Sequence, residues 1–300
     1  MIAFGAAMTD PEAFRRYARP GIARAAEPGS ETYAIAAVGP ICRGYNLILD
    51  RAAREEELEA LVLIHQEVEI VDGELCAKLR RAFADPEVAV VGAIGATGVR
   101  SIAWWEGEIS SGPVMQRYQE HGGGELPAFS FKERLPAPAD VEMVDGFLMA
   151  LSPWAVRNVR FDESLWLGHG YDLDFCLRVR EAGRRVRTED LRLVHHRAEL
   201  ELLEDLDLWT AGHMYAAERL DGRLPGARPA DDWKARARRA EAARDGARTI
   251  AYSTSHRCDA ELAPLERGIE EMEASRSWRV TKPLRRLNSW RRSTGRERQR

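Results

Sequence analysis

The chain has 300 residues, of which 45% are hydrophobic, 8% aromatic and 31% charged, and its formal net charge is −4. This length allows one large α/β domain with an appendage or two small domains, and the composition excludes a largely disordered, collagen-like or membrane-spanning protein. The near-neutral charge gives no overall argument for nucleic acid as a partner. Four widely spaced cysteines without a C-x-x-C pair indicate reduced thiols, so we expect a cytoplasmic protein.

The first two thirds of the chain alternate short apolar segments with amphipathic ones. The apolar segments predict buried strands over residues 1–8, 33–38, 61–64 and 88–92, and the amphipathic segments predict helices over 45–53 and 72–84. Regular patterning fades from 97 to 138 and returns at 141–151. This alternation of strands and helices predicts a layered α/β domain.

A last group of elements precedes a change in composition. A helix follows Gly170 and ends at Gly183, and two short strands flank residues 189–190. Beyond residue 222 the chain becomes rich in Pro and Gly, and then in Ala, Arg and Glu. We therefore divide the chain into a domain at 1–222, a linker with a charged helix at 223–257, and a helical segment with a basic amphipathic tail at 258–300.

The strand predicted at 61–64 ends in a polar sequence, His65-Gln66-Glu67. If the extended backbone continues, His65 and Glu67 project to one side, because side chains at i and i+2 of a strand share a face. The carboxyl end of a buried strand is where α/β sheets bind ligands. The alternative is a polar strand end that meets solvent.

Two further clusters of polar residues follow later in the chain. Asp172 and Asp174 open the helix after Gly170, where one aspartate can cap the helix and the other remains for acid/base chemistry or binding. His195 and His196 are neighbours on the last predicted strand and must point in opposite directions. We expect one of the histidines to bind a ligand and the other to be structural.

Taken in order, these segments resemble bacterial family-2-type glycosyltransferases of the GT-A fold, in the glycosyltransferase-like or streptomycin-biosynthesis-type branch. The matching segments are 61–68, 144–150 with 161–163, 170–178 and 194–196, and the resemblance covers roughly residues 1–220. It implies a GT-A Rossmann-like three-layer α/β domain with a mostly parallel mixed sheet. The residues beyond this domain are predicted to form a helical C-terminal extension.

The resemblance also implies the chemistry of the site. In this family a divalent cation neutralises the leaving diphosphate of a nucleotide-sugar donor. The residues implied as metal ligands are His65, Glu67, His195 and His196. Histidine in place of a carboxylate favours Mn²⁺ over Mg²⁺.

The resemblance assigns two further roles near the donor. Asp172 stands at the position of the base that deprotonates the acceptor and gives inversion, with Asp174 as the second catalytic carboxylate. Arg43 and Asn46 stand near the donor's nucleotide or diphosphate, beside His65 and Glu67. Polar residues at the start of a helix are the alternative for Arg43 and Asn46.

The segment with little regular patterning contains candidate acceptor residues. Trp104 and Trp105 have aromatic faces on which a sugar ring can stack, and the glycine-rich residues 121–125 could hinge a lid. Asp145 and Gly146 belong to the acceptor-side segment that the resemblance implies. Packed core tryptophans and a flexible loop are the alternatives.

The C-terminal residues differ from the rest of the chain. Residues 276–300 carry a net charge of +9, against −13 for residues 1–275. Residues 277–285 resemble a segment found near the ends of many bacterial glycosyltransferases, and a helix here would be basic and amphipathic. The tail is therefore predicted to bind an anionic membrane surface, with a disordered basic end as the alternative. Upstream, Leu262, Leu265, Ile269 and Met272 predict a short coiled-coil seam or a face that docks on the main domain.

These observations predict a glycosyltransferase that moves a sugar from a nucleotide-diphosphate donor to a glycan or lipid-linked acceptor. Its expected place is the cytoplasm, peripheral at the inner membrane face, in polysaccharide biosynthesis. The alternative is a catalytically inactive, glycosyltransferase-like binding module in polysaccharide assembly. A metal-dependent hydrolase built on His65, Glu67 and the histidine pair is a more distant alternative.

Overall fold

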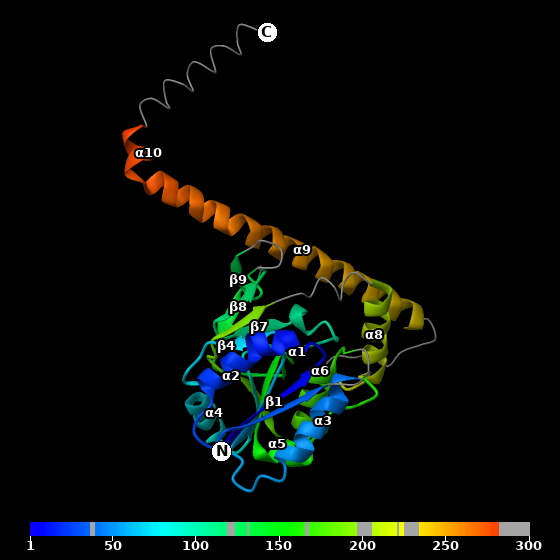
Figure 1. Ribbon diagram of the computed structural model, residues 1–300. Coiled ribbons are helices and arrows are strands. Elements are labelled where there is room, and N and C mark those ends of the chain that lie inside the picture. Colours follow the sequence, from blue (N-terminus) through cyan, green and yellow to red (C-terminus); the bar gives the residue numbers. More distant parts are fainter. Residues whose placement is uncertain are drawn as a thin grey trace.

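A seven-stranded mixed sheet forms the centre of the computed structural model (Figure 1). Its strands stand in the order β11 (Ala139–Val141), β14 (Arg185–Thr188), β5 (Val88–Gly92), β13 (Leu148–Leu151), β3 (Ala60–Ile64), β1 (Ile2–Met8) and β2 (Glu31–Ala36). All but β13 and β11 run in the same direction. The structure describes residues 1–36, 40–118, 124–130, 132–165, 168–196, 206–220, 222–224 and 234–281.

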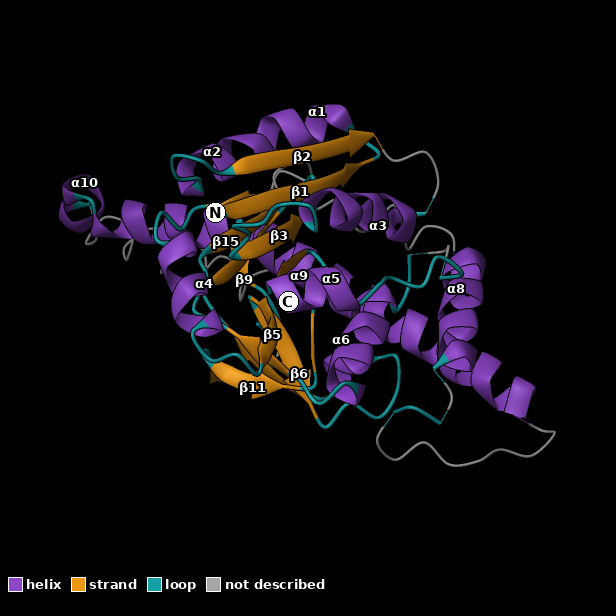
Figure 2. Cartoon of the chain, turned by 90° about the horizontal axis from the view of Figure 1, so that it is seen from below, coloured by secondary structure: helices purple, strands orange, loops and turns teal. Residues whose placement is uncertain are grey.

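Helices cover both faces of this sheet. The helices α2 (Arg19–Ala25) and α4 (Leu75–Phe83) lie on one side, and α3 (Ile41–Ala52), α5 (Pro153–Asn158) and α6 (Tyr171–Glu181) lie on the other (Figures 1 and 2). Side chains 61–64 of β3 are fully buried, because this central strand has a helical layer on each face. The predicted three-layer α/β class with a mostly parallel mixed sheet is confirmed.

Local sequence signals explain where several helices begin and end. Asp10 caps a helical segment formed by α1 (Pro11–Ala13), a π-helical turn (Phe14–Ala18) and α2, and its carboxylate accepts from the backbone N–H of Glu12 at 2.8 Å. Ser152 caps α5 in the same way. Gly183 follows α6 with a φ of 75°, a conformation that glycine adopts without strain. The helical segment after β1 has no counterpart among the predicted elements.

The segment without clear patterning contributes strands to two small sheets. One contains β10 (Arg134–Pro136), β7 (Glu108–Ser111), β6 (Ile94–Thr97) and β12 (Met143–Val144), and the other contains β4 (Val68–Ile70), β15 (Leu193–His196), β8 (Val114–Arg117) and β9 (Glu125–Pro127). A 3₁₀ turn at Trp104–Glu106 precedes β7. These strands have two to four residues each, too few for a periodic signal.

Three helices form the C-terminal extension: α8 (Leu206–Arg219), α9 (Lys234–Ala274) and α10 (Arg276–Val280). Helix α9 runs without interruption past residue 257, where the sequence predicted a boundary between two segments. Its first part lies against α8, a later part contacts β9, and its last part projects from the domain (Figure 1). None of the described helices is long and apolar enough to cross a membrane.

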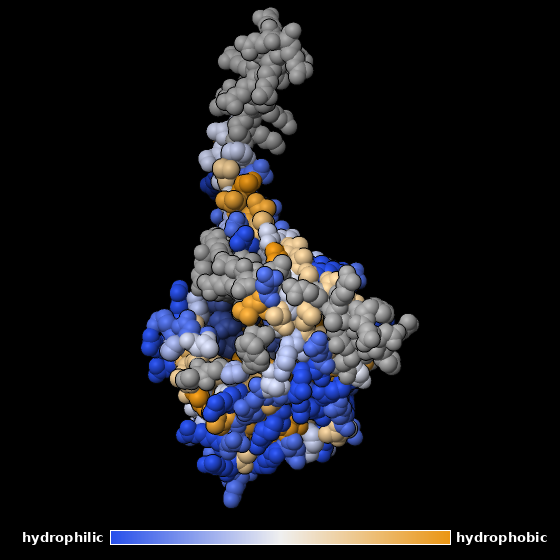
Figure 3. Space-filling view, turned by 90° about the vertical axis from the view of Figure 1, so that its right-hand side faces the viewer, coloured by the Kyte–Doolittle hydropathy of each residue, from blue (hydrophilic) through white to orange (hydrophobic). Residues whose placement is uncertain are grey.

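The predicted apolar face of the extension lies on the projecting part of α9. Leu262, Leu265, Ile269 and Met272 are 45–63% exposed, and Figure 3 shows hydrophobic residues gathered there. The alternative in which this face docks on the main domain is therefore wrong. The basic tail beyond Thr281 and residues 121–123 of the predicted lid lie outside the described residues.

Candidate functional site

The polar residues after β3 form a compact cluster. His65 begins a turn instead of extending the strand, and its backbone N–H donates to Phe147 O at 2.9 Å. Its Nδ1 lies 3.1 Å from Glu67 Oε1, and its Nε2 lies 2.8 Å from the hydroxyl of Tyr171. Gln66 turns away and accepts from the backbone N–H groups of Thr9 and Asp10. His65 and Glu67 therefore meet as expected, although through a turn.

The two histidines of β15 have different surroundings. His195 Nε2 lies 3.5 Å from Glu67 Oε1, so this histidine joins the cluster after β3. His196 Nε2 lies 3.0 Å from Glu69 Oε2, and its ring stacks on Tyr17 at 3.9 Å. The structure thus brings His195 to His65 and Glu67 but places His196 in a separate contact with the N-terminal helical segment.

Charge and burial in the cluster favour an ion pair between His65 and Glu67. Burial alone would raise the pKa of Glu67, but hydrogen bonds with His195 and His65 outweigh it and hold this pKa well below its usual value. Burial alone would lower the pKa of His65, but the hydrogen bond with Glu67 and the nearby negative charges together raise it. Glu67 is therefore a carboxylate shared by two imidazoles.

Asp172 lies at the start of α6, beside the loop between β12 and β13. Its Oδ2 accepts from Gly146 N at 3.0 Å, and its Oδ1 accepts from Leu173 N at 2.8 Å. Burial raises the pKa of Asp172 to about 7, and the nearby charge of Asp145 adds to the shift. No arginine or lysine in the described part of the chain forms a salt bridge with Asp172.

Gly146 makes this arrangement possible. A Cβ atom at residue 146 would lie 2.2 Å from the hydroxyl oxygen of Tyr171, so any other residue would push that ring away from His65. Gly146 is buried, and its N–H is used by Asp172. The structure thus gives Gly146 a supporting position, whereas the sequence placed it among acceptor-binding residues.

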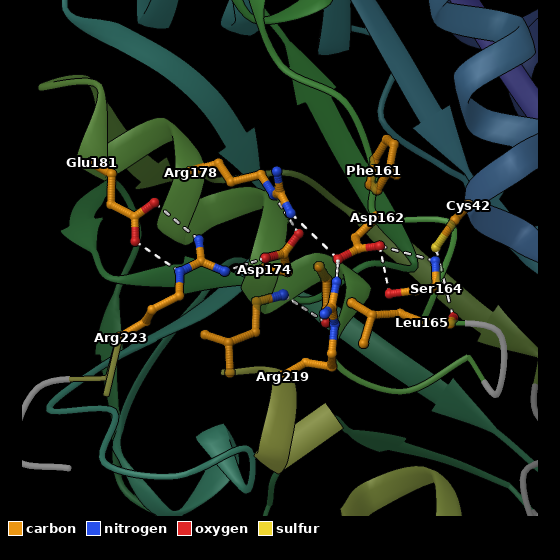
Figure 4. A network of polar contacts seen from close by, with 12 residues as sticks. Cys42, Phe161, Asp162, Ser164, Leu165, Asp174, Arg178, Glu181, Arg219 and Arg223 are labelled. Carbon is orange, nitrogen blue, oxygen red and sulfur yellow. Dashed lines mark hydrogen bonds and ion pairs between the residues drawn. The ribbon is translucent and has the colours of Figure 1, made fainter. Parts of the chain in front are cut away.

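Asp174 points into a different network, although it is only two residues from Asp172. Its carboxylate pairs with Arg178 Nε at 2.6 Å and with Arg223, and Arg223 also contacts Glu181 (Figure 4). Asp174 is 1% exposed. This carboxylate is saturated by two guanidinium groups and lies away from the cluster after β3.

Arg43 and Asn46 occupy the first turns of α3. Arg43 is exposed. Asn46 donates to Phe161 O and to Glu163 Oε1, each at 3.0 Å, and its Oδ1 accepts from Phe161 N at 3.0 Å. The amide of Asn46 therefore fastens the segment before α6, and these contacts differ from the donor-binding role that the sequence predicted.

A cavity of about 260 Å³ adjoins the cluster, and we call it the aromatic cavity. His195, Asp145 and Phe147 line its inner side, next to Glu67 and Asp172. Trp104 and Trp105, the predicted acceptor residues, line it as well. The remaining lining residues include four that the sequence analysis did not single out: Phe129, Trp209, Tyr252 and His256.

Three of the four predicted metal ligands lie together, and the fourth, His196, does not join them. Among the described residues, no three or more His, Cys, Asp or Glu side chains are placed to hold a metal ion. Both ring nitrogens of His65 are engaged by Glu67 and Tyr171, and His196 contacts Glu69 instead. Glu67 lies between His65 and His195 and contacts both of them.

Sequence reasoning missed Tyr171 and the cavity residues of α8 and α9. Tyr171 stands next to the singled-out Asp172, but nothing in the sequence pairs it with His65, which lies 106 positions away. Tyr252 lies beyond the composition change near residue 222, at which the sequence predicts the end of the functional domain. Trp209 lies near the end of that domain, after the last predicted strand. The aromatic residues themselves were the available signal.

Comparisons with known proteins agree on one family. A model of the glycosyltransferase like family matches residues 22–203. The streptomycin biosynthesis protein StrF of Streptomyces griseus is 30% identical over 198 residues, which cover 65% of this chain and 66% of that protein. The match therefore spans slightly less than two thirds of the relative's length.

Solved structures with a similar arrangement are more distant in sequence. The mannosyltransferase PcManGT of Pyrobaculum calidifontis, in complex with GDP-Man and Mn²⁺, is 13% identical with a TM-score of 0.44, over 93% of this chain and 81% of that one. GalNAc-T7 with UDP, GalNAc and Mn²⁺ is 9% identical with a TM-score of 0.46, over 85% of this chain and 57% of that one. At this identity the likeness concerns the fold alone.

Proposed function

Since the chain belongs to the glycosyltransferase like family, we propose that it transfers a sugar from a nucleotide-diphosphate donor to a hydroxyl group of an acceptor. The family match at residues 22–203 covers more than half of the chain. This range contains the cluster of His65, Glu67 and His195 and the start of α6 with Asp172. The aromatic cavity adjoins both and provides a place for the acceptor.

The observation that carries the proposal is the environment of Asp172. This carboxylate is buried, has backbone N–H partners instead of arginines, and has a pKa of about 7. A general base works best when its pKa lies near the operating pH, because it is then largely ionised and still a strong proton acceptor. The carboxylate of Asp174, by contrast, is held in ion pairs with Arg178 and Arg223.

In the proposed reaction Asp172 takes the proton of the acceptor hydroxyl. The hydroxyl oxygen forms a bond to the anomeric carbon, and the bond from this carbon to the diphosphate oxygen breaks. The diphosphate leaves with the bonding electrons, and attack on the opposite face inverts the anomeric configuration. Asp145, in the cavity wall beside Asp172, orients the acceptor hydroxyl.

A divalent cation does not fit the predicted ligand set. Both ring nitrogens of His65 are engaged in hydrogen bonds, one with Glu67 and one with the hydroxyl of Tyr171. His196 is bonded to Glu69, away from Glu67. We therefore derive no step through a cation, and Mn²⁺ stays a prediction of the sequence.

The same mismatch favours a second candidate function. A binding module would bind a nucleotide sugar without catalysing its transfer. Such a protein would not need side chains arranged to bind a metal ion. The two candidates differ in turnover. Incubation with UDP-, GDP- and dTDP-sugars, with and without Mn²⁺, separates them by the release of nucleoside diphosphate.

Replacing Asp172 tests the proposed base. We expect Asp172→Asn to reduce transfer by about 10²–10⁴-fold, the usual contribution of a general base. Binding of the nucleoside diphosphate, measured as a shift in Tm, should be unchanged. Asp145→Asn serves as the comparison, because it should raise the KM of the acceptor more than it lowers kcat. Unchanged turnover in Asp172→Asn, or a loss confined to kcat in Asp145→Asn, would reject Asp172 as the base.

A further inference from the structure

The outer wall of the aromatic cavity comes from α8 and α9, which lie outside the residues matched by the family model. Trp209 of α8 and Thr249, Tyr252, Ser253 and His256 of α9 line the cavity. The inner wall, with Asp145 and His195, lies within the matched range. The cavity is therefore closed by the part of the chain that a conserved glycosyltransferase domain alone would lack.

Buried contacts fix this outer wall in place. His213 of α8 is 3% exposed, its Nε2 lies 3.2 Å from Asp245 Oδ2 of α9, and its ring stacks on Trp209 at 4.6 Å. The contact between His213 and Asp245 thus ties α8 to α9, and the stacked His213 ring orients Trp209. On the other side of the cavity, His256 Nε2 lies 3.3 Å from Ser130 Oγ. The wall is anchored at both ends and does not depend on a ligand.

A third attachment depends on the proline in α9. Pro264 has no N–H, so the carbonyl of Ala260 lacks its usual helical donor. The N–H of Gly124, near the tip of the β8–β9 hairpin, donates to that carbonyl at 2.6 Å. This hydrogen bond fixes the position of α9 relative to strand β9, which Gly124 precedes.

The chemistry of the lining indicates what the cavity holds. Several aromatic faces, including those of Trp104, Trp105 and Trp209, surround a space with neutral polar side chains such as Thr249 and Ser253. Among the lining residues that the structure describes, Asp145 is the only Asp, Glu, Lys or Arg. Aromatic faces take the apolar C–H faces of sugars, and neutral hydroxyl groups bond to sugar hydroxyls.

The size of the cavity limits its ligand. Sites for drug-sized ligands measure roughly 300–1,000 Å³. The aromatic cavity, at about 260 Å³, suits one ring with its substituents.

We propose that α8 and α9 complete an acceptor site for a single uncharged sugar ring, stacked between the tryptophans and facing Asp145. This inference rests on the proposed function, since it names the acceptor of that reaction. Trp209, Tyr252 and Ser253 then determine acceptor specificity from outside the family-matched range. A lipid or oligosaccharide attached to the ring lies outside the cavity.

Two serines on α9 provide a matched test. Ser253 lines the cavity, whereas Ser255 is exposed on the same helix. Ser253→Phe should fill the cavity, and Ser255→Phe adds the same ring outside it. Binding is measured by saturation-transfer NMR with methyl α-D-glucoside, methyl α-D-mannoside and methyl β-D-galactoside as probes. We expect at least one probe to bind the full-length wild type and Ser255→Phe, with affinity about tenfold lower in Ser253→Phe, equivalent to ~1.4 kcal/mol.

Further measurements keep the outcome clear. Tyr252→Ala, which removes a lining ring, should weaken the same probe and covers the case in which Ser253→Phe unfolds. Binding of no probe by the wild type, equal binding by the two serine variants, or stronger binding of cationic D-glucosamine than of every neutral probe would overturn the inference. Nucleoside diphosphate binding is measured in parallel. If it persists while the glycosides fail, only the acceptor site is rejected, and if glycosides bind without any donor turnover, the proposed function is rejected.

Discussion

Asp172 and Asp174, two carboxylates of helix α6, differ in the groups that surround them. Asp172 has backbone N–H partners and the negative Asp145 nearby, and its pKa rises to about 7. Asp174 contacts Arg178 and Arg223 (Figure 4). Asp162, in the segment before α6, contacts Arg178 and Arg219. Burial would raise the pKa of Asp162, but its hydrogen bonds from Ser164 and Arg219 lower it to about 2.

This difference shows that burial alone does not decide the role of a carboxylate. A buried aspartate with guanidinium partners stays ionised and supports the fold, whereas one without them is poised to exchange a proton near neutral pH. The residue type and the helix are the same. The arginines, which come from α6, α8 and the segment after α8, make the difference.

The largest expected contrast comes from the same substitution at both aspartates. Removing one partner of a buried ion pair costs about 3–5 kcal/mol, and because Arg178 and Arg223 are partly exposed we expect Asp174→Asn to cost about 3 kcal/mol of unfolding free energy. Asp172→Asn should cost about 1 kcal/mol or less, because it loses one hydrogen bond but removes an unpaired buried charge. Urea denaturation measures both.

The two variants should differ in activity in the opposite order to their stability. Folded Asp174→Asn should transfer sugar at nearly the wild-type rate, while Asp172→Asn should not. Equal losses of stability in the two variants, or loss of activity in folded Asp174→Asn, would contradict the division between the two aspartates.

A pH profile tests the same division with a smaller effect. Below its pKa of about 7 the base is protonated, so kcat should fall with decreasing pH, approaching about tenfold per pH unit. Above this pKa the rate should be level with respect to Asp172. Asp174→Asn should keep this acid limb, and the residual activity of Asp172→Asn should lack it. A wild-type profile that is flat between pH 5 and pH 8 would count against Asp172.

The smallest effect is expected at the edge of the arginine network. Arg219 is 49% exposed and lies 2.8 Å from Asp162, so Arg219→Ala should lower the Tm only slightly, and by less at high salt. Because the pKa of Asp162 is lowered to about 2 from 3.8, the stabilisation by this pair is complete above the unfolded value and disappears as the pH falls toward the folded one. If Arg219→Ala reduced stability as much as Asp174→Asn, exposure would not weaken the Arg219–Asp162 pair.

The sequence predicted the central layers of the fold well because those strands are buried on both faces. Residues 61–64 and 88–92 are continuous apolar runs, and the strands lie where they were expected. The short strands between Ile94 and Pro136 were not predicted, since their pairing depends on distant partners such as β12 and β15. The uninterrupted course of α9 was also missed, because its composition changes along its length.

The site was predictable in part. The end of β3 before His65 and the start of α6 follow from local patterns, and the structure places Glu67 beside His195 and Trp104 beside the cavity. The partners of Asp174 and Asn46 could not be read from the sequence, because Arg223 and Phe161 reach them from distant segments. The roles predicted for metal ligands depend on such partners and remain predictions.

The proline in α9 also divides that helix into two parts with different tolerance for change in length. Each inserted residue rotates the following helix by about 100°. An insertion before Ala260 would turn the Ala260 carbonyl away from the N–H of Gly124. The cavity residues of α9 and this hydrogen bond could then no longer both keep their positions. An insertion beyond Pro264 would leave that bond and the cavity unchanged, so the projecting end of α9 is where the chain can be lengthened, shortened or joined to another protein.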